Sequence, residues 1–206
     1  MLKLKNSRPL FVGGTRYVFQ HPQHANRCVK VLRPDRTGAA RKVLRKDFKR
    51  YLPERFLDDQ LKEIKAYREL LTRASETLWR YVPRYHGTED TDMGVGIVTQ
   101  LMRNGDGSWP QNLEQMLVNG KDPALQAGID EFTEAVGKLR ILSRDLLPHN
   151  IIAVKEEHGY RVMLVDGIGN AELIPLSTWS GFFARRKTQR KIRRFRQRCE
   201  LLLPRS

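Results

Sequence analysis

Three residues in the second half of the chain, Asp145, Asn150 and Asp166, have the types and spacing to hold metal ions beside a reacting group. The first two lie in the segment Arg-Asp-Leu-Leu-Pro-His-Asn (144–150), and the third follows Asn150 by sixteen residues. Carboxylate and amide oxygens suit Mg²⁺, which favours hard oxygen ligands and bound phosphate. Such a set is typical of a phosphoryl-transfer site.

The elements around these residues must bring them together. Pro148 disfavours a regular helix or a central strand, because it fixes φ and has no N–H, so 144–150 is predicted to be an ordered loop. Residues 151–154 and 160–165 have strand-like composition, and 157–159 separate them as a turn. A hairpin there would return the chain and place Asp166 beside Asn150. The alternative is a polar surface loop whose aspartates only cap turns.

Two features of the first half could bind an anion. Gly13 and Gly14 form a turn between two strand-like runs, and glycines let backbone N–H groups approach a phosphate. Lys30 lies within an apolar strand, where it either reaches solvent at an edge or points at an anion. An ordinary hairpin remains the alternative for the two glycines. Glu63, on a predicted helix, is the preferred partner for Lys30, and Glu69 is the competing choice.

The remaining pattern predicts an α+β fold with a sheet-rich first part and a helical second part. Apolar residues at spacings of three and four predict a helix over 54–75, with its buried stripe at Leu57, Leu61, Ile64, Tyr67 and Leu71. Asp122 and Pro123 predict the start of another helix, and a shorter one is expected over 112–118. Strands are predicted at 10–12, 16–20, 27–32, 84–88 and 96–102.

The charge of the chain is strongly positive and uneven. The formal net charge is +15, and from Arg185 to Arg198 there are nine basic residues and no acidic one. Such a segment suits an anionic membrane surface, nucleic acid or an acidic partner. Phe182, Phe183 and Phe195 would allow an interfacial helix. The alternative is a solvated basic helix that packs Ile192, Phe195 and 201–203 onto the domain.

The length of the chain and its cysteines indicate its domain organisation and its cellular location. A chain of 206 residues is expected to form one domain, with a first lobe over 1–102, a reduced second lobe over 103–180 and a basic tail over 181–206. Cys28 and Cys199 form no disulfide or metal-ligand pattern, which favours a reduced cytoplasmic location. The N-terminus has no apolar signal region, and no segment is long and apolar enough to span a membrane.

The chain resembles a compact protein-kinase-like fold and, within it, the YrbL family of PhoP-regulatory-network proteins. The residues that carry the resemblance cover roughly 9–175, and they lie in six segments: 13–22, 26–31, 82–87, 94–98, 144–150 and 165–169, with Lys30 in the second. The loop with Asp145 and Asn150, together with the strand lysine, is specific to kinase-like folds. His21-Pro22 and residues 166–169 point to the YrbL group.

The resemblance implies a role for each candidate residue. Lys30, positioned by Glu63, would hold the α and β phosphates of ATP, and the backbone at Gly13 and Gly14 would cover them. Gln100, Leu101 and Met102 would form the hinge beside the adenine. Asp145 would accept the proton of an attacking hydroxyl, while Asn150 and Asp166 would hold Mg²⁺.

The sequence also departs from the kinase pattern. Ser143 stands where the kinase motif has His, Ile168 stands where it has Phe, and only two adjacent glycines occupy the turn. Forty residues follow Asp166 without an Ala-Pro-Glu segment, which favours a small-molecule, lipid or sugar acceptor, or a protein bound through the basic tail. The function expected first is ATP-dependent phosphotransfer. An inactive pseudokinase acting as a regulatory partner is the second, and a basic nucleic-acid-binding protein is the third.

Overall fold

The chain forms two compact units. The structure is a computed structural model that describes residues 1–44, 58–144, 146–169 and 181–204. Unit 1 comprises Met1–Thr72 and Arg84–Leu101, and unit 2 comprises Arg73–Pro83 and Met102–Ser206. The predicted α+β class is confirmed, because most strands belong to unit 1 and the two longest helices belong to unit 2.

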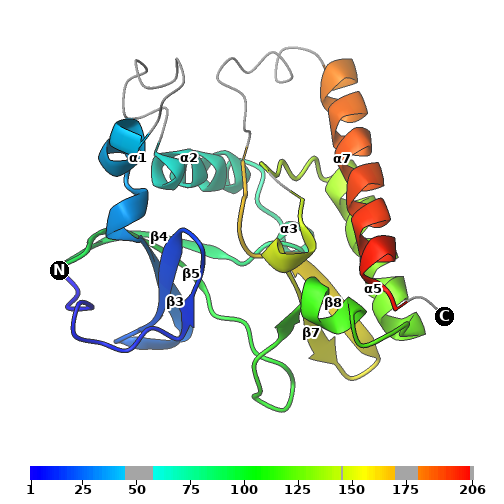
Figure 1. Cartoon of the computed structure of the whole chain (residues 1–206), viewed down its shortest axis with the longest axis horizontal. Helices are drawn as coiled ribbons and strands as arrows, with labels where there is room; N and C mark the ends of the chain where they lie inside the picture. The colour runs from blue at the N-terminus through cyan, green and yellow to red at the C-terminus, as the bar shows by residue number, and fades with distance from the viewer. Residues whose placement is uncertain (45–57, 145, 170–180, 205–206) are drawn as a thin grey trace. The chain divides into compact units, whose positions relative to one another are not determined.

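Unit 1 is built on one antiparallel sheet of five strands in the order β1-β2-β3-β5-β4 (Figure 1). All five predicted strands are present, with ends that differ by a few residues. The sheet and its helices have these bounds: β1 Phe11–Val12, β2 Arg16–His21, β3 His24–Leu32, β4 Tyr85–Thr91, β5 Gly94–Gln100, a 3₁₀ turn at Pro34–Arg36, α1 Gly38–Leu44 and α2 Asp59–Leu71.

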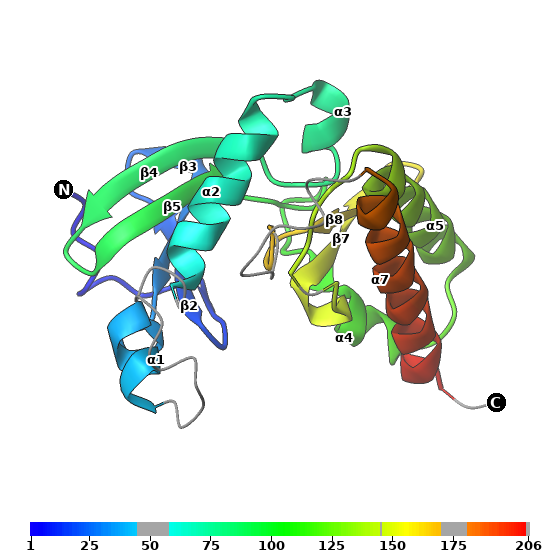
Figure 2. The same ribbon diagram turned by 90° about the horizontal axis from the view of Figure 1, so that it is seen from above.

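The two faces of this sheet have different roles. Alternation along β3 sends Val29 and Val31 into an apolar cluster with Leu4, Phe19 and Val98, all of them buried. The intervening residues Cys28 and Lys30 therefore face the other side. Figure 2 shows α2 lying across the sheet of unit 1. The strand register puts Arg16 on the same face as Lys30, and the ion pair of Arg16 with Glu63 places α2 on that face.

Helix α2 differs from the prediction in both its bounds and its buried face. Its N-cap is Asp58, whose carboxylate accepts from the amides of Gln60 and Leu61, so the helix begins at Asp59 rather than at residue 54. It ends at Leu71, and Ser75 instead caps α3 (Glu76–Trp79) of unit 2. Residues 54–57, including Leu57 of the predicted stripe, lie outside the described residues.

The predicted apolar stripe of α2 is wrong at two positions. Leu61 and Leu71 are 49% and 47% exposed, whereas Gln60 and Glu63 are buried. The helix is turned so that polar side chains face the sheet, because they have partners there that sequence periodicity does not reveal. Ile64 and Tyr67 are buried as predicted, and the Tyr67 ring stacks on Tyr85 at 4.8 Å between centroids.

Unit 2 contains a three-stranded antiparallel sheet in the order β6-β7-β8. The predicted hairpin and the predicted helix starts near 112 and at Asp122-Pro123 are confirmed. Elements after α3 have these bounds: β6 Gln111–Asn112, α4 Leu113–Leu117, α5 Pro123–Lys138, a 3₁₀ turn η4 at Pro148–Asn150, β7 Ile151–Glu156, β8 Gly159–Leu164 and α7 Gly181–Leu202.

Helix α5 packs closely on β8. Asp122 caps it by accepting from the amides of Ala124 and Leu125. Gly128 is required at the contact, because a Cβ there would come within 2.5 Å of the carbonyl oxygen of Tyr160. The buried side chains of Leu125, Ile129 and Phe132 complete the sheet-facing side of the helix.

The basic C-terminal segment forms α7, which packs on unit 2 (Figure 1). Phe195 is fully buried, with its ring edge-on to Phe132 at 6.2 Å between centroids. Arg196 pairs with Asp130 on α5 at 2.8 Å and donates to the hydroxyl of Thr133. Phe195 therefore packs onto the domain, as the alternative for the basic segment predicted. Leu201, which was predicted to pack there too, is 81% exposed.

Candidate functional site

The glycine turn of unit 1 connects β1 to β2. The amide of Gly13 donates to the carbonyl of Arg16 at 2.8 Å, which closes the turn. Neither Gly13 nor Gly14 adopts left-handed backbone, and a Cβ added to Gly14 would meet nothing within 4 Å. Because the fold does not require a glycine at position 14, its open side is free for the approach of a ligand.

Lys30 lies in the middle of β3 and is 7% exposed. Its neighbours across the sheet are Val18 on β2 and Ile97 on β5. Burial raises the pKa of the nearby Cys28 thiol, and the positive charge of Lys30 partly opposes this effect. Strand alternation places the Lys30 side chain on the face of the sheet opposite to Val29 and Val31. Its contact with an anion stays a prediction.

Glu63 is fully buried on α2 and pairs with Arg16, a residue that the sequence analysis did not select. The distance from Arg16 Nη1 to Glu63 Oε2 is 2.7 Å, and Arg16 is 4% exposed. Arg16 also donates from Nη2 to the carbonyl of Asp59 at 3.3 Å, near the start of α2. A sequence signal existed, because Arg16 begins the strand after the glycine turn and lies two residues before Val18, the cross-strand neighbour of Lys30, so both side chains share one face.

Of the two glutamates considered, Glu63 is the one that faces the sheet. The side chain of Glu69 is 56% exposed and lies 4.0 Å from Lys65 on the same helix. The pairing of Glu63 with Lys30 itself stays a prediction.

Gln60 fixes α2 to the sheet at the position of Lys30. Its Nε2 donates to the carbonyl of Val95 at 2.6 Å and to that of Lys30 at 3.4 Å. Gln60 is buried, so these bonds form away from water, where an unsatisfied amide would be costly. The helix that carries Glu63 is thus tied to the strand that carries Lys30.

The backbone amides of the three predicted hinge residues differ in their hydrogen-bond partners. The amide of Gln100 donates to Arg84 O at 2.8 Å, and the amide of Leu101 donates to Asn26 O at 2.9 Å, both within unit 1. Met102 begins the next part of unit 2, where its side chain packs with Val154 and Met163. Within the described part of the chain, the Met102 amide donates to no backbone carbonyl. The role of the three residues as a hinge stays a prediction.

In unit 2 the hairpin brings Asp166 to Asn150, as predicted. Ile151 pairs with Leu164 at the open end of the hairpin. One residue beyond that pair, the carbonyl of Asn150 accepts from the amides of Val165 and Asp166, at 2.9 and 3.4 Å. Oδ1 of Asp166 also accepts from the amide of Gly167 at 2.6 Å. Two oxygen-bearing side chains of the kind that Mg²⁺ prefers therefore leave adjacent points of the backbone.

The donor set fits Mg²⁺ held together with substrate phosphates. The described residues contain no group of three or more His, Cys, Asp or Glu that could hold a metal ion. Mg²⁺ commonly uses only one or two carboxylates and completes its shell with water and phosphate oxygens. Asp145 lies outside the described residues, so its predicted role is untested.

The segment before Asp145 is paired with the segment after Asp166. Ser143 forms a bridge with Ile168, the amide of Arg144 donates to Gly167 O at 2.7 Å, and the amide of Gly169 donates to Leu142 O at 2.8 Å. The hydroxyl of Ser143 donates to Gly167 O at 3.3 Å. Ser143, which replaces the His of the kinase motif, thus links the two loops directly.

We predict that Glu63→Gln lowers the free energy of unfolding by about 3 kcal/mol or more, because it leaves the buried guanidinium of Arg16 without its ionised partner. Urea unfolding followed by circular dichroism measures the change. Glu69→Gln is the matched control on the same helix and should cost less than about 0.5 kcal/mol, as expected for an exposed pair. Equal losses in the two variants would contradict a structural role for the buried pair.

Solved structures of kinase domains are among the proteins similar to this chain. Among solved structures, the kinase domain of Mycobacterium tuberculosis PknI is 18% identical over 78% of this chain and 57% of that chain, with a TM-score of 0.45. The BubR1 kinase domain is 12% identical over 82% of this chain and 48% of that chain, with a TM-score of 0.48. The chain therefore spans about half the length of the kinase domains it matches.

Two curated relatives match almost the whole chain. The protein named Uncharacterized protein YrbL in Escherichia coli (strain K12) is 30% identical over 200 residues, which cover 95% of this chain and 86% of that protein. The protein of the same name in Shigella flexneri gives the same values. The family model described as PhoP regulatory network protein YrbL matches residues 2–200. The chain belongs to the YrbL family.

Proposed function

We propose that the protein binds ATP with Mg²⁺ and transfers the γ-phosphate to a hydroxyl acceptor. The observation that carries the proposal is the hydrogen bond from the Val165 amide to the Asn150 carbonyl, which holds Asn150 and Asp166 together at the open end of one hairpin.

Unit 1 supplies the phosphate-binding residues of the proposal. Lys30 is a buried cation on a central strand, and a phosphate group would neutralise it with strong charge-assisted hydrogen bonds. Glu63 would orient Lys30 from the helix that Gln60 ties to the same strand. The open side of Gly14 supports backbone contact with the phosphates, and the Met102 amide supports contact with the adenine.

Unit 2 supplies the metal-binding and proton-accepting residues. Asn150 and Asp166 would hold Mg²⁺, which neutralises charge on the transferring phosphoryl group when it is bound. Asp145 would accept the proton of the attacking hydroxyl. The links between 142–144 and 167–169 support this role, because they hold the entry to Asp145 next to the exit from Asp166.

Several chemical classes of hydroxyl acceptor fit the proposal. A small molecule, a lipid or sugar head group, or a protein bound through the basic segment would each present a hydroxyl. A pseudokinase, which would bind nucleotide at the same residues without turnover and act on a regulatory partner, is the second candidate. Both candidates require nucleotide binding, so turnover separates them.

We predict that ATP with Mg²⁺ raises the unfolding temperature of the protein and that Asp166→Ala abolishes this stabilisation, because the metal is no longer held. Asp145→Ala should keep the stabilisation and lower the rate of γ-phosphate transfer or hydrolysis by about 10²- to 10⁴-fold, the usual value of a positioned base. Thermal unfolding and release of label from γ-labelled ATP measure the two effects.

Glu157→Ala, which removes an exposed acidic residue from the turn of the same hairpin, is the matched control and should change neither measurement. Stabilisation without turnover would favour the pseudokinase. No response to ATP in the wild-type protein would refute both candidates.

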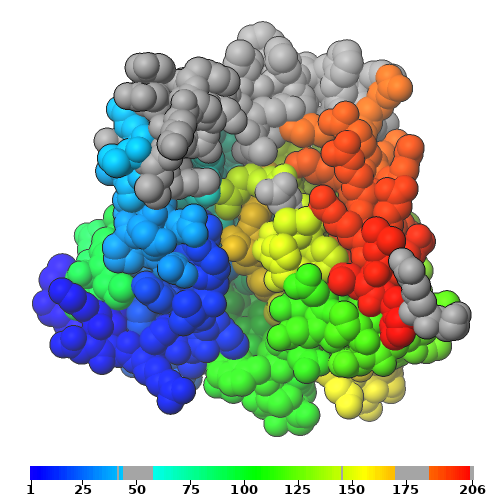
Figure 3. Space-filling model, viewed as in Figure 1, coloured from blue at the N-terminus to red at the C-terminus, as the bar shows by residue number. Residues whose placement is uncertain are grey.

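A second property, attachment to an anionic membrane surface, is favoured by an arginine stripe on α7, defined as Arg186, Arg190, Arg193 and Arg194. Their spacing places them on one helix face, and all four are exposed. Figure 3 shows α7 at the surface of unit 2, from orange to red. Since Phe195 is buried against α5, we propose electrostatic attachment through the stripe rather than insertion of an apolar face. None of the described helices is long and apolar enough to cross a membrane.

We predict that the triple variant Arg190→Gln, Arg193→Gln, Arg194→Gln weakens binding to vesicles rich in phosphatidylserine by about 10²-fold, since each arginine near the surface contributes about 1 kcal/mol. The matched control Lys3→Gln, Lys5→Gln, Arg8→Gln removes the same charge from exposed positions in unit 1. Vesicle sedimentation measures both. Equal losses would contradict a role for the stripe, and salt-sensitive binding of nucleic acid in place of vesicles would favour the nucleic-acid alternative.

A further inference from the structure

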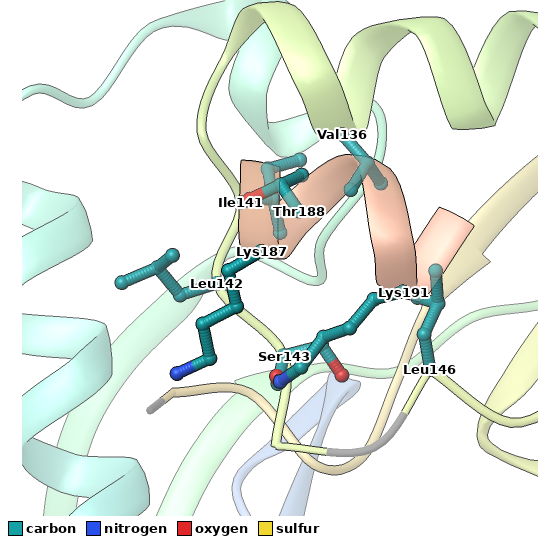
Figure 4. A pocket seen from close by; sticks show the side chains of 8 residues that line it. All are labelled: Val136, Ile141, Leu142, Ser143, Leu146, Lys187, Thr188 and Lys191. Carbon is teal, nitrogen blue, oxygen red and sulfur yellow. The ribbon is translucent and has the colours of Figure 1, made fainter. Parts of the chain in front are cut away.

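Helix α7 contacts the segment that leads into Asp145. The ammonium group of Lys191 donates to the backbone carbonyl of Ser143 and, at 3.1 Å, to that of Arg144. Figure 4 shows the side chain of Lys191 extending from α7 to the backbone beside Ser143. These two carbonyls belong to the two residues that precede Asp145 in the chain.

The contact completes a clamp on residues 142–144. The Arg144 amide and the Ser143 hydroxyl are bonded to Gly167, and the Leu142 carbonyl accepts from Gly169. The carbonyls of Ser143 and Arg144 point instead toward α7, where one lysine binds both. The segment is therefore held on one side by residues 167–169 and on the other by α7.

The surroundings of Lys191 strengthen these bonds. The lysine lines a small pocket whose apolar walls include Val136, Ile141 and Leu146 (Figure 4). Ile141 and Leu146 are buried, and Lys191 itself is half-buried. Hydrogen bonds from a charged donor in such a partly desolvated place are stronger than bonds made in water.

The helix that carries Lys191 is itself anchored. One turn further along α7, Phe195 packs against Phe132, and Arg196 pairs with Asp130 on α5. A side chain on an anchored helix positions its partner better than one on a loop.

We propose that Lys191 is a positioning residue that sets the path of the backbone entering Asp145. The proposal rests on the proposed function, in which Asp145 accepts the proton of the acceptor hydroxyl. By binding the last two carbonyls before Asp145, the lysine holds the backbone at the point where it leads into that residue. Helix α7, for which the sequence predicted binding to an anionic partner or packing onto the domain, thereby takes part in the phosphotransfer site.

The test compares Lys191→Met, which keeps the aliphatic stem and removes the donors, with Arg198→Met. Arg198 lies two turns further along α7 on the same flank and is exposed, so it is a matched loss of charge. Hydrogen exchange is measured over 142–150, α5 and α7, and ATP stabilisation and γ-phosphate transfer are measured on the same samples.

For Lys191→Met we expect exchange over 142–150 to be about 10-fold faster, with α5 and α7 unchanged. ATP-induced stabilisation should be kept, and transfer should fall by about 10- to 10²-fold, the cost of misplacing a reacting group by about 1 Å. Arg198→Met should change none of these. Lys191→Gln, which keeps a single donor group, should be intermediate.

Unchanged exchange over 142–150 in Lys191→Met would overturn the inference, whatever the activity. Faster exchange throughout unit 2 in both Lys191 variants would also overturn it, because the lysine would then be a general packing residue. Failure of the proposed function is distinguishable, since it appears as a wild-type protein that ATP does not stabilise, while the exchange measurement still reports on the clamp.

Discussion

The register of the β7–β8 hairpin determines where the candidate chemistry of unit 2 can take place. Ile151 opposite Leu164 leaves Asn150 and Val165 as the next pair, so Asp166 emerges beside Asn150. A slip of one residue would turn Val162 away from α5, where it lies beside Gly128, and Met163 away from its buried cluster with Met102 and Val154. The hydrophobic core thus enforces the position of two polar residues that contribute nothing to it. The pairing of 142–144 with 167–169 and the contact from Lys191 both build on this register.

In unit 1 a comparable constraint comes from buried charge. Arg16, Lys30 and Glu63 are each less than a tenth exposed, and they belong to two strands of the sheet and to α2, which covers it. Burying ionised groups costs more free energy than burying apolar side chains of similar size. The chain nevertheless keeps this set beside its glycine turn, which supports a functional role for the set in addition to a structural one.

Much of the fold followed from local sequence signals. Alternation predicted the strands, and Asp122 with Pro123 predicted the start of α5, because a strand face and an N-cap are determined within a few residues. The face of α2 could not be predicted in this way. Leu61 and Leu71 matched the apolar period better than Gln60 and Glu63 did, yet the polar pair is buried because its partners lie on strands far away in sequence.

The residues of the candidate site likewise include some that local sequence predicts and some that depend on long-range contacts. Asp166 meeting Asn150 could be predicted, since one hairpin joins them. Arg16 was missed because its partner is 47 residues away, and Lys191 was missed because it binds backbone carbonyls, which have no signature in sequence. Long-range contacts of polar groups are the part of a site that periodicity and motifs do not encode.

Titration calorimetry of ATP, with and without Mg²⁺, on the wild-type protein and on Lys30→Met tests the central claim most directly. We expect ATP to bind the wild-type protein more tightly with Mg²⁺ than without it, and to bind Lys30→Met more weakly by about 10-fold or more, since the buried ammonium group proposed to meet the phosphates is lost while the strand stays apolar and packed. Equal ATP affinity in the two proteins, or no binding in either, would contradict it.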